Sequence, residues 1–169
     1  MKQSKLIAAC GMTAALSVVI MFIGGVLGLG MYASPMIAGV CLIPIGRRFG
    51  RKYQVLLWLA VSILCFILVP GVEENLMYLT IFGVYPILYP SFQRLRPVMR
   101  WVCKLLYFNM VVIAVEALVV TLLAPEVLTP WMIALLLVLG NITFVLYDCL
   151  LPRAARLLHL RLSRLKFLR

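Results

Sequence analysis

Residues 6–29, with the sequence LIAACGMTAALSVVIMFIGGVLGL, form 24 consecutive positions without a charged side chain. At the helical rise of 1.5 Å per residue, this stretch is long enough to cross a hydrocarbon layer of about 30 Å. Of the 169 residues in the chain, 65% are hydrophobic and 12% are charged, whereas soluble domains are roughly 45–50% apolar and about 25% charged. Backbone groups in lipid must form hydrogen bonds within the protein. We therefore expect an all-α integral membrane protein.

Five further apolar runs follow the first one. They cover residues 31–45, 53–69, 76–89, 105–124 and 131–151. The second and fourth runs are short and contain proline or glycine. The sequence has no repeat or linker that divides it, so we expect a single six-helix transmembrane domain over residues 1–169, with a basic tail at residues 152–169.

The positions of the basic residues predict the topology. All sixteen lie in four clusters: Lys2 and Lys5; Arg47, Arg48, Arg51 and Lys52; Arg94, Arg96, Arg100 and Lys104; and six residues from Arg153 to Arg169. Basic residues accumulate in short cytoplasmic loops. Six crossings, with both termini inside, place every cluster in the cytoplasm, and removal of the second or fourth crossing alone places clusters outside. The net charge of +11 thus predicts orientation in the cell membrane and no nucleic-acid partner.

The sequence lacks the patterns of common catalytic and metal sites. It contains no nucleophile elbow, no H-E-x-x-H, no P-loop and no dinucleotide-binding fingerprint. Its single histidine, His159, lies in the basic tail, and the five cysteines are scattered without a C-x-x-C pair. We expect no enzyme activity, no cofactor and no bound metal.

Two acidic residues lie within the predicted spans, where charged groups are costly and often functional. Glu116 and Asn141 fall near the middle of the fifth and sixth runs, at similar depth. They are expected either to bond the two helices or to contact a ligand. Asp148 is level with Lys104, which predicts a structural ion pair at the cytoplasmic edge, with Asn109 as a further candidate for that network.

A polar group, Glu73, Glu74 and Asn75, follows Pro70-Gly71 at the predicted outer side. It is either a solvated turn or the rim of an outward-facing pocket, since interrupted helices mark binding sites in transporters. The outer half of the bundle has acidic residues but no Lys, Arg or His, so the expected ligand is a neutral or cationic small molecule. Phe82 and Tyr85 are candidates to pack against it.

A stripe of small residues, Ala8, Gly11 and Ala15, follows one side of the first run. Such spacing lets two helices approach closely. The stripe therefore predicts either packing within the bundle or docking onto another membrane protein.

The six short helices, the small-residue stripe and the glycine-rich segment after the first run resemble the substrate-binding S component of energy-coupling-factor (ECF) transporters. The strings FGVYPIL (82–88), KLLYFN (104–109) and NITFVLYD (141–148) are also similar to those of small bacterial membrane proteins grouped with these components. The resemblance implies capture of a small molecule from outside by a subunit docked to a transmembrane coupling subunit and two ATPase subunits. In S components an Ala-x-x-x-Ala motif contacts the coupling subunit, and here Gly11 and Ala15 would take its place.

Two other classes are compatible with the same pattern. A structural or assembly protein of the inner membrane, similar to small rod-shape scaffolding proteins, would have this topology without a substrate pocket. The second class is one half of a dimeric transporter. Residues 48–52, RFGRK, are similar to a cytoplasmic loop of major-facilitator transporters, although the preceding Asp is absent.

Overall fold

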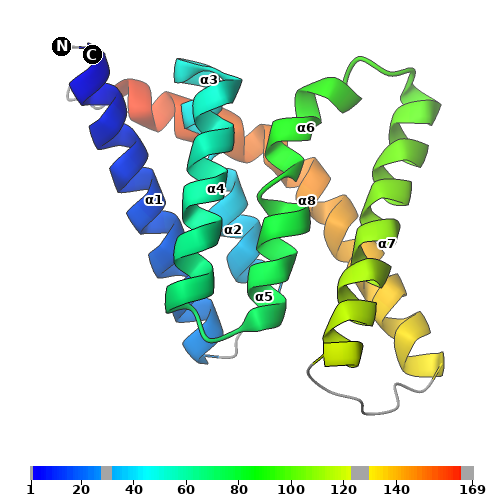
Figure 1. Ribbon diagram of the computed structural model, residues 1–169. Coiled ribbons are helices and arrows are strands. Elements are labelled where there is room, and N and C mark those ends of the chain that lie inside the picture. The colour runs from blue at the N-terminus through cyan, green and yellow to red at the C-terminus, as the bar shows by residue number, and fades with distance from the viewer. Residues whose placement is uncertain (1, 28–31, 123–129, 165–169) are drawn as a thin grey trace. The chain divides into compact units, whose positions relative to one another are not determined.

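The computed structural model describes residues 2–27, 32–122 and 130–164 of the chain, and within these ranges every regular element is helical (Figure 1). The expected all-α class is therefore confirmed. Four helices are long: α1 (Lys2–Leu27), α4 (Arg51–Leu68), α7 (Pro97–Leu122) and α8 (Pro130–Arg164).

Each long helix contains a segment long and apolar enough to cross a membrane. These segments are Ser4–Leu27, Arg51–Leu68, Pro97–Thr121 and Leu137–Arg156. Large apolar side chains are exposed along all of them, as at Ile7, Ile67 and Met110. Exposed apolar surface on this scale is what a membrane protein presents to lipid.

The second apolar run forms two helices instead of the single one expected over residues 31–45. These are α2 (Ala33–Cys41) and α3 (Ile43–Phe49), separated by Leu42. Pro44 is the second residue of α3, a position that tolerates proline because the amide there has no helical partner. Gly50 has a φ of 101°, which lets the chain turn sharply from α3 into α4. Residue 31 lies outside the described ranges.

The fourth run is also divided, and it extends beyond the expected residues 76–89. It consists of α5 (Val72–Met77), a π-helical turn η1 (Tyr78–Phe82) and α6 (Tyr85–Phe92). The Gly83 amide donates to the Tyr78 carbonyl at 2.8 Å, which closes a five-residue step. Pro86 is the second residue of α6 and cannot continue the helix before it.

The last helix is longer than the predicted sixth span. Residues 152–164, predicted as a surface tail, continue α8 through Pro152 to Arg164. The segment after Pro152 is rich in Leu, Ala and Arg, which have high helix propensity. At the other end of this region, α7 begins at Pro97, before the expected residue 105, because proline is favoured at a first helical position.

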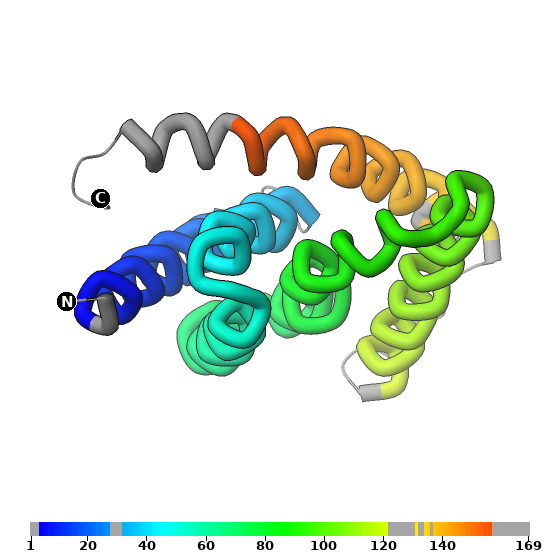
Figure 2. The backbone as a smooth tube through the Cα atoms, turned by 90° about the horizontal axis from the view of Figure 1, so that it is seen from above, coloured from blue at the N-terminus to red at the C-terminus, as the bar shows by residue number. Residues whose placement is uncertain are grey.

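The chain divides into two compact units, one of residues 1–88 and 151–169 and one of residues 89–150. In the first unit α1 packs against α2 and α4, and α2 packs against η1 (Figure 2). The core of this unit is apolar and includes Met21, Ala38, Leu42, Val61 and Cys65. Ser17 in α1 donates to the Ala38 carbonyl at 3.4 Å, which ties α1 to α2.

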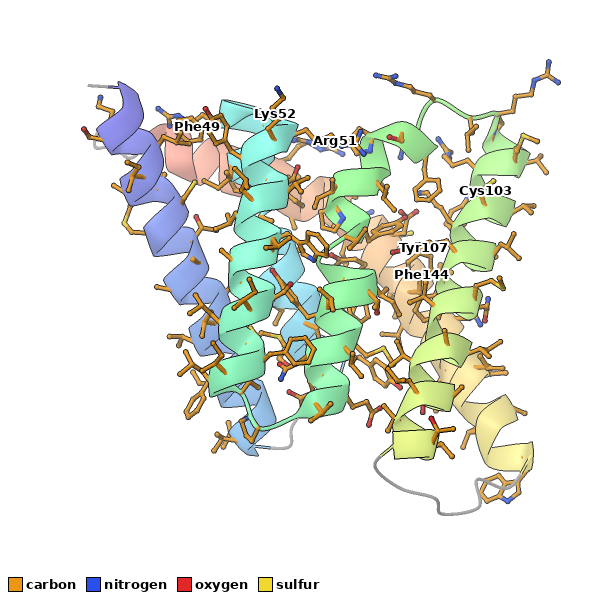
Figure 3. The ribbon with its side chains drawn as sticks, viewed as in Figure 1. Phe49, Arg51, Lys52, Cys103, Tyr107 and Phe144 are labelled. Carbon is orange, nitrogen blue, oxygen red and sulfur yellow. The ribbon has the colours of Figure 1, made fainter. Side chains whose placement is uncertain are left out.

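The helical segments of the first unit run back and forth between two ends. The start of α1 lies at the same end as the turn between α3 and α4, while the turn between α4 and α5 lies at the opposite end (Figure 1). Arg51 and Lys52 therefore lie at the end where α1 begins, close to Phe49 (Figure 3). The acidic residues Glu73 and Glu74 belong to the first turn of α5, at the other end.

Candidate functional site

The second unit contains the ion pair that the sequence predicts. Lys104 Nζ lies 2.7 Å from each carboxylate oxygen of Asp148, and the two side chains are 1% and 8% exposed. Two aromatic rings add cation–π contacts to the same ammonium, Tyr89 at 4.9 Å and Trp101 at 5.3 Å from the ring centroids. The ammonium and the carboxylate neutralise each other in a largely buried position, so the cluster is suited to fixing α7 against α8.

Asn109 and Asn141 form a reciprocal amide pair between the same two helices. Each Nδ2 donates to the other residue's Oδ1, at 3.0 and 2.8 Å. The remaining amide hydrogens go to the backbone carbonyls of Leu105 and Leu137, both at 2.8 Å. Asn109 thus belongs to a separate polar contact from the one suggested by the sequence.

The expected bond between Glu116 and Asn141 is replaced by this amide pair, because both amide hydrogens of Asn141 are already used. Glu116 lies seven residues beyond Asn109, about 10 Å farther along α7. Its Oε1 is buried without a hydrogen-bond partner in the described part of the chain.

The hairpin register explains why Glu116 differs from the two paired residues. Lys104 pairs with Asp148 and Asn109 with Asn141, so facing residues have numbers that add to about 250. The same register places Ala134 opposite Glu116, and alanine offers no polar side chain. Between the two pairs, Phe108 stacks on Phe144 with ring centroids 4.5 Å apart.

In the first unit, Glu74 and Asn75 are buried rather than part of a solvated turn. They are 7% and 2% exposed. Asn75 Nδ2 donates to the Val69 carbonyl at 3.0 Å, which closes the turn between α4 and α5. Glu74 Oε2 and Asn75 Oδ1 are both buried and have no hydrogen-bond partner among the described residues.

Glycine permits the close packing of the Glu74 carboxylate. A Cβ at Gly25 of α1 would lie 3.2 Å from Glu74 Oε2 and 3.0 Å from Val69 Cγ1. A Cβ at Gly71 would lie 3.2 Å from the carboxylate carbon of Glu74. Burial disfavours the charged form and raises the pKa of Glu74, which lies in the first turn of α5, outside the four segments long and apolar enough to cross a membrane. The sequence identified this acid but gave no sign that the glycine-rich end of α1 would contact it.

The other predicted contacts in the first unit differ in exposure. Phe82 and Tyr85 are 1% and 0% exposed, so they pack inside the unit in this conformation. Glu73 is half-buried and does make an interaction. Glu73, Glu74, Asn75, Phe82 and Tyr85 belong to the first unit, whereas Glu116 and Asn141 belong to the second.

A contact that the sequence did not predict lies beside η1. A Cβ at Gly83 would meet the Trp58 ring at 2.5 Å, and Trp58 Nε1 is buried without a partner among the described residues. Glycine at position 83 therefore leaves room both for the Tyr78 carbonyl of the π-helical turn and for the Trp58 ring.

The small-residue stripe of α1 lies on the surface of its unit. Ala8, Gly11 and Ala15 are all exposed, and a Cβ at Gly11 would meet no atom within 4 Å. Of the two readings of the stripe, packing against described parts of the first unit is not seen.

Metal-ligand clusters of three or more His, Cys, Asp or Glu side chains are absent from the residues that the structure describes. Comparison of the chain with protein-family models, curated proteins and solved structures finds no match.

Proposed function

We propose that the protein is a membrane-embedded capture subunit of the S-component type, which binds a neutral or cationic small molecule for uptake. The observation that carries this proposal is the pair of buried acceptors, Glu74 Oε2 and Asn75 Oδ1, which have no partner among the described residues. An unsatisfied buried polar group costs about 1–3 kcal/mol. A ligand that donates hydrogen bonds to both oxygens would recover that free energy, which would favour its binding.

The proposed topology has six spans with both termini in the cytoplasm. The alternation within the first unit supports it, since Arg51 and Lys52 lie at one end and α5 begins at the other. Together α2 and α3 form one traverse of the unit, and α5, η1 and the first half of α6 form another (Figure 1). On this topology Glu74 and Asn75 are at the outer side, where a capture subunit meets its substrate.

The exposed stripe of α1 supports a coupling partner. Gly11 leaves the helix backbone open on a surface that no described residue covers. A helix of the proposed transmembrane coupling subunit can approach such a surface closely. Two ATPase subunits would then supply the energy, because the sequence has no nucleotide-binding motif of its own.

A structural or assembly protein of the membrane is the second candidate. The complete burial of Tyr78, Phe82 and Tyr85 favours it, because a filled interior needs no ligand. On this reading Glu74 and Asn75 help only to shape the turn between α4 and α5.

Purification from the membranes of the native host distinguishes the two candidates. We expect the capture subunit to co-purify with ATP hydrolysis activity and with two ATPase chains identified by mass spectrometry. Gly11→Leu and Ala15→Leu should abolish this association, while Val19→Leu, on another exposed position of α1, should retain it. A purified protein that carries no ATPase, and that no small molecule in a vitamin and nucleobase panel stabilises, would contradict the proposal.

A further inference from the structure

Glu74 Oε2 and Asn75 Oδ1 belong to different chemical groups but have the same role in hydrogen bonding. A carboxylate oxygen and an amide oxygen are both hydrogen-bond acceptors, and here both are buried on adjacent residues of α5. We propose that Glu74 and Asn75 bind the ammonium group of a primary amine, so that the captured solute is an organic cation. This inference rests on the proposed capture function and names its substrate class.

The charges of the helices around α5 disfavour an anionic group beside Glu74. The described helices that pack most against α5 are α2, α4 and η1. Their only basic residues are Arg51 and Lys52, at the start of α4, and that start lies at the opposite end of the unit from the turn between α4 and α5 (Figure 3). Glu73 and Glu74 are the only acidic residues in α2, α4, α5 and η1. A buried anion needs a cation or several donors, whereas a cation would find a carboxylate.

The number of acceptors favours an ammonium over a metal ion. Calcium takes six to eight oxygen ligands, and magnesium takes six in near-ideal octahedral geometry. Two unpartnered side-chain oxygens fall short of such a shell. An ammonium has three N–H donors, and two of them would satisfy Glu74 Oε2 and Asn75 Oδ1. A hydrogen bond between two charged groups is about twice as strong as one between neutral groups.

The packing around Glu74 makes the site sensitive to very small changes. The position of a Cβ at Gly25 is only 3.2 Å from Oε2, so Gly25→Ala would press on the oxygen that the amine must reach. This substitution leaves both acceptors in the chain. It therefore tests access to the carboxylate separately from its chemistry.

Thermal unfolding of the purified full-length protein tests the inference with defined probes. The probes are ethylamine and benzylamine at pH 7, each compared with the alcohol of matching size, with benzoate and with sodium chloride. We expect at least one amine to raise the unfolding midpoint by a few degrees, and its matching alcohol, benzoate and sodium to have no such effect. Equal stabilisation by amine and alcohol, or stabilisation by benzoate or sodium, would overturn the inference, and so would no stabilisation by either amine.

Variants assign the effect to the Glu74 carboxylate. Glu74→Gln and Gly25→Ala should remove the response to the amine, while Glu73→Gln, which removes the same charge from the same turn, should retain it. A response that survives Glu74→Gln would place the amine elsewhere. If the variants do not fold, the comparison of amine with alcohol in the unsubstituted protein decides the outcome.

Different results would reject the proposed capture function and the proposed substrate class. Stabilisation by an uncharged member of the vitamin and nucleobase panel, with association to the ATPases, would retain the capture function and reject the amine. Loss of the ATPase association together with no response to any compound would reject both.

Discussion

Lys104 and Asp148 are 44 residues apart in the sequence and form a buried ion pair, with Nζ 2.7 Å from both carboxylate oxygens. Lys104 is nearly inaccessible, and the rings of Tyr89 and Trp101 lie close to its ammonium. A buried charge without its partner is strongly destabilising, whereas the intact pair adds little net stability. The pair therefore fixes the geometry of the hairpin more than it adds to its free energy of unfolding.

Removal of one member of this pair should destabilise the protein severely. Asp148→Asn leaves the Lys104 ammonium without a counter-charge, and we expect a loss of about 3–5 kcal/mol in the free energy of unfolding. Addition of Lys104→Met should recover part of that loss, as measured by denaturant unfolding in detergent micelles. Additive losses in the double variant would show that the two side chains act independently.

The Asn109 and Asn141 side chains should be energetically coupled, and loss of either one should lower the free energy of unfolding by less than Asp148→Asn does. Interhelical hydrogen bonds in membranes contribute about 0.6 kcal/mol on average and up to about 2 kcal/mol. Asn109→Leu and Asn141→Leu should each destabilise the protein by a similar amount, and the double variant by less than their sum. A control at Met110, an exposed position of the same helix, changed to Leu, should leave the unfolding midpoint unchanged.

Much of the helical architecture follows from the sequence. Unbroken apolar runs such as residues 6–29 and 53–69 predict helices close to α1 and α4, because length and hydropathy are sufficient there. The breaks within the short runs depend on single residues. Pro44 and Pro86 are the second residues of new helices, and the sequence predicted an interruption in these runs without showing where the preceding helix ends.

The polar contacts were predictable only in part. Equal depth in the membrane identified Lys104 and Asp148, because one register of an antiparallel hairpin brings them together. Depth also suggested Glu116 with Asn141, but Asn109 fits the same register and takes both amide hydrogens. The burial of Glu74 was not predictable, because it depends on Gly25 from a helix distant in sequence.

Glu116 offers a test of whether an intramembrane acid serves the fold or a ligand. Because its Oε1 is an unpartnered buried acceptor, Glu116→Leu should raise the free energy of unfolding by about 1 kcal/mol. The measurement is denaturant unfolding in the absence of ligand. If Glu116→Leu abolishes stabilisation by an amine while the protein stays folded, Glu116 contacts the substrate and the assignment to Glu74 alone is incorrect.

Cysteine labelling checks the proposed orientation. In a background without the five native cysteines, a cysteine at Val72, which is 41% exposed, should react with a membrane-impermeant reagent added to intact cells. Cysteines at Arg48 and Arg96 should react only after the membrane is opened. Labelling of Arg48→Cys from outside would exclude six spans with a cytoplasmic N-terminus.

The stability of the ligand-free protein should fall as pH rises, because of Glu74. Burial raises the pKa of this carboxyl above its ordinary value of 4.5, so the folded protein holds the proton at pH values where the unfolded chain has lost it. Between about pH 4.5 and the raised pKa, the unfolded state binds fewer protons, and the free energy of unfolding therefore decreases with pH. Below this window the contribution of Glu74 is fully present, and above it the curve is level again. Unfolding midpoints measured from pH 4 to pH 9 should show this decrease, Glu74→Gln should remove it, and Glu73→Gln should retain it. A pH profile that Glu74→Gln leaves unchanged would contradict this prediction, because the carboxyl would then bind protons alike in the folded and unfolded protein.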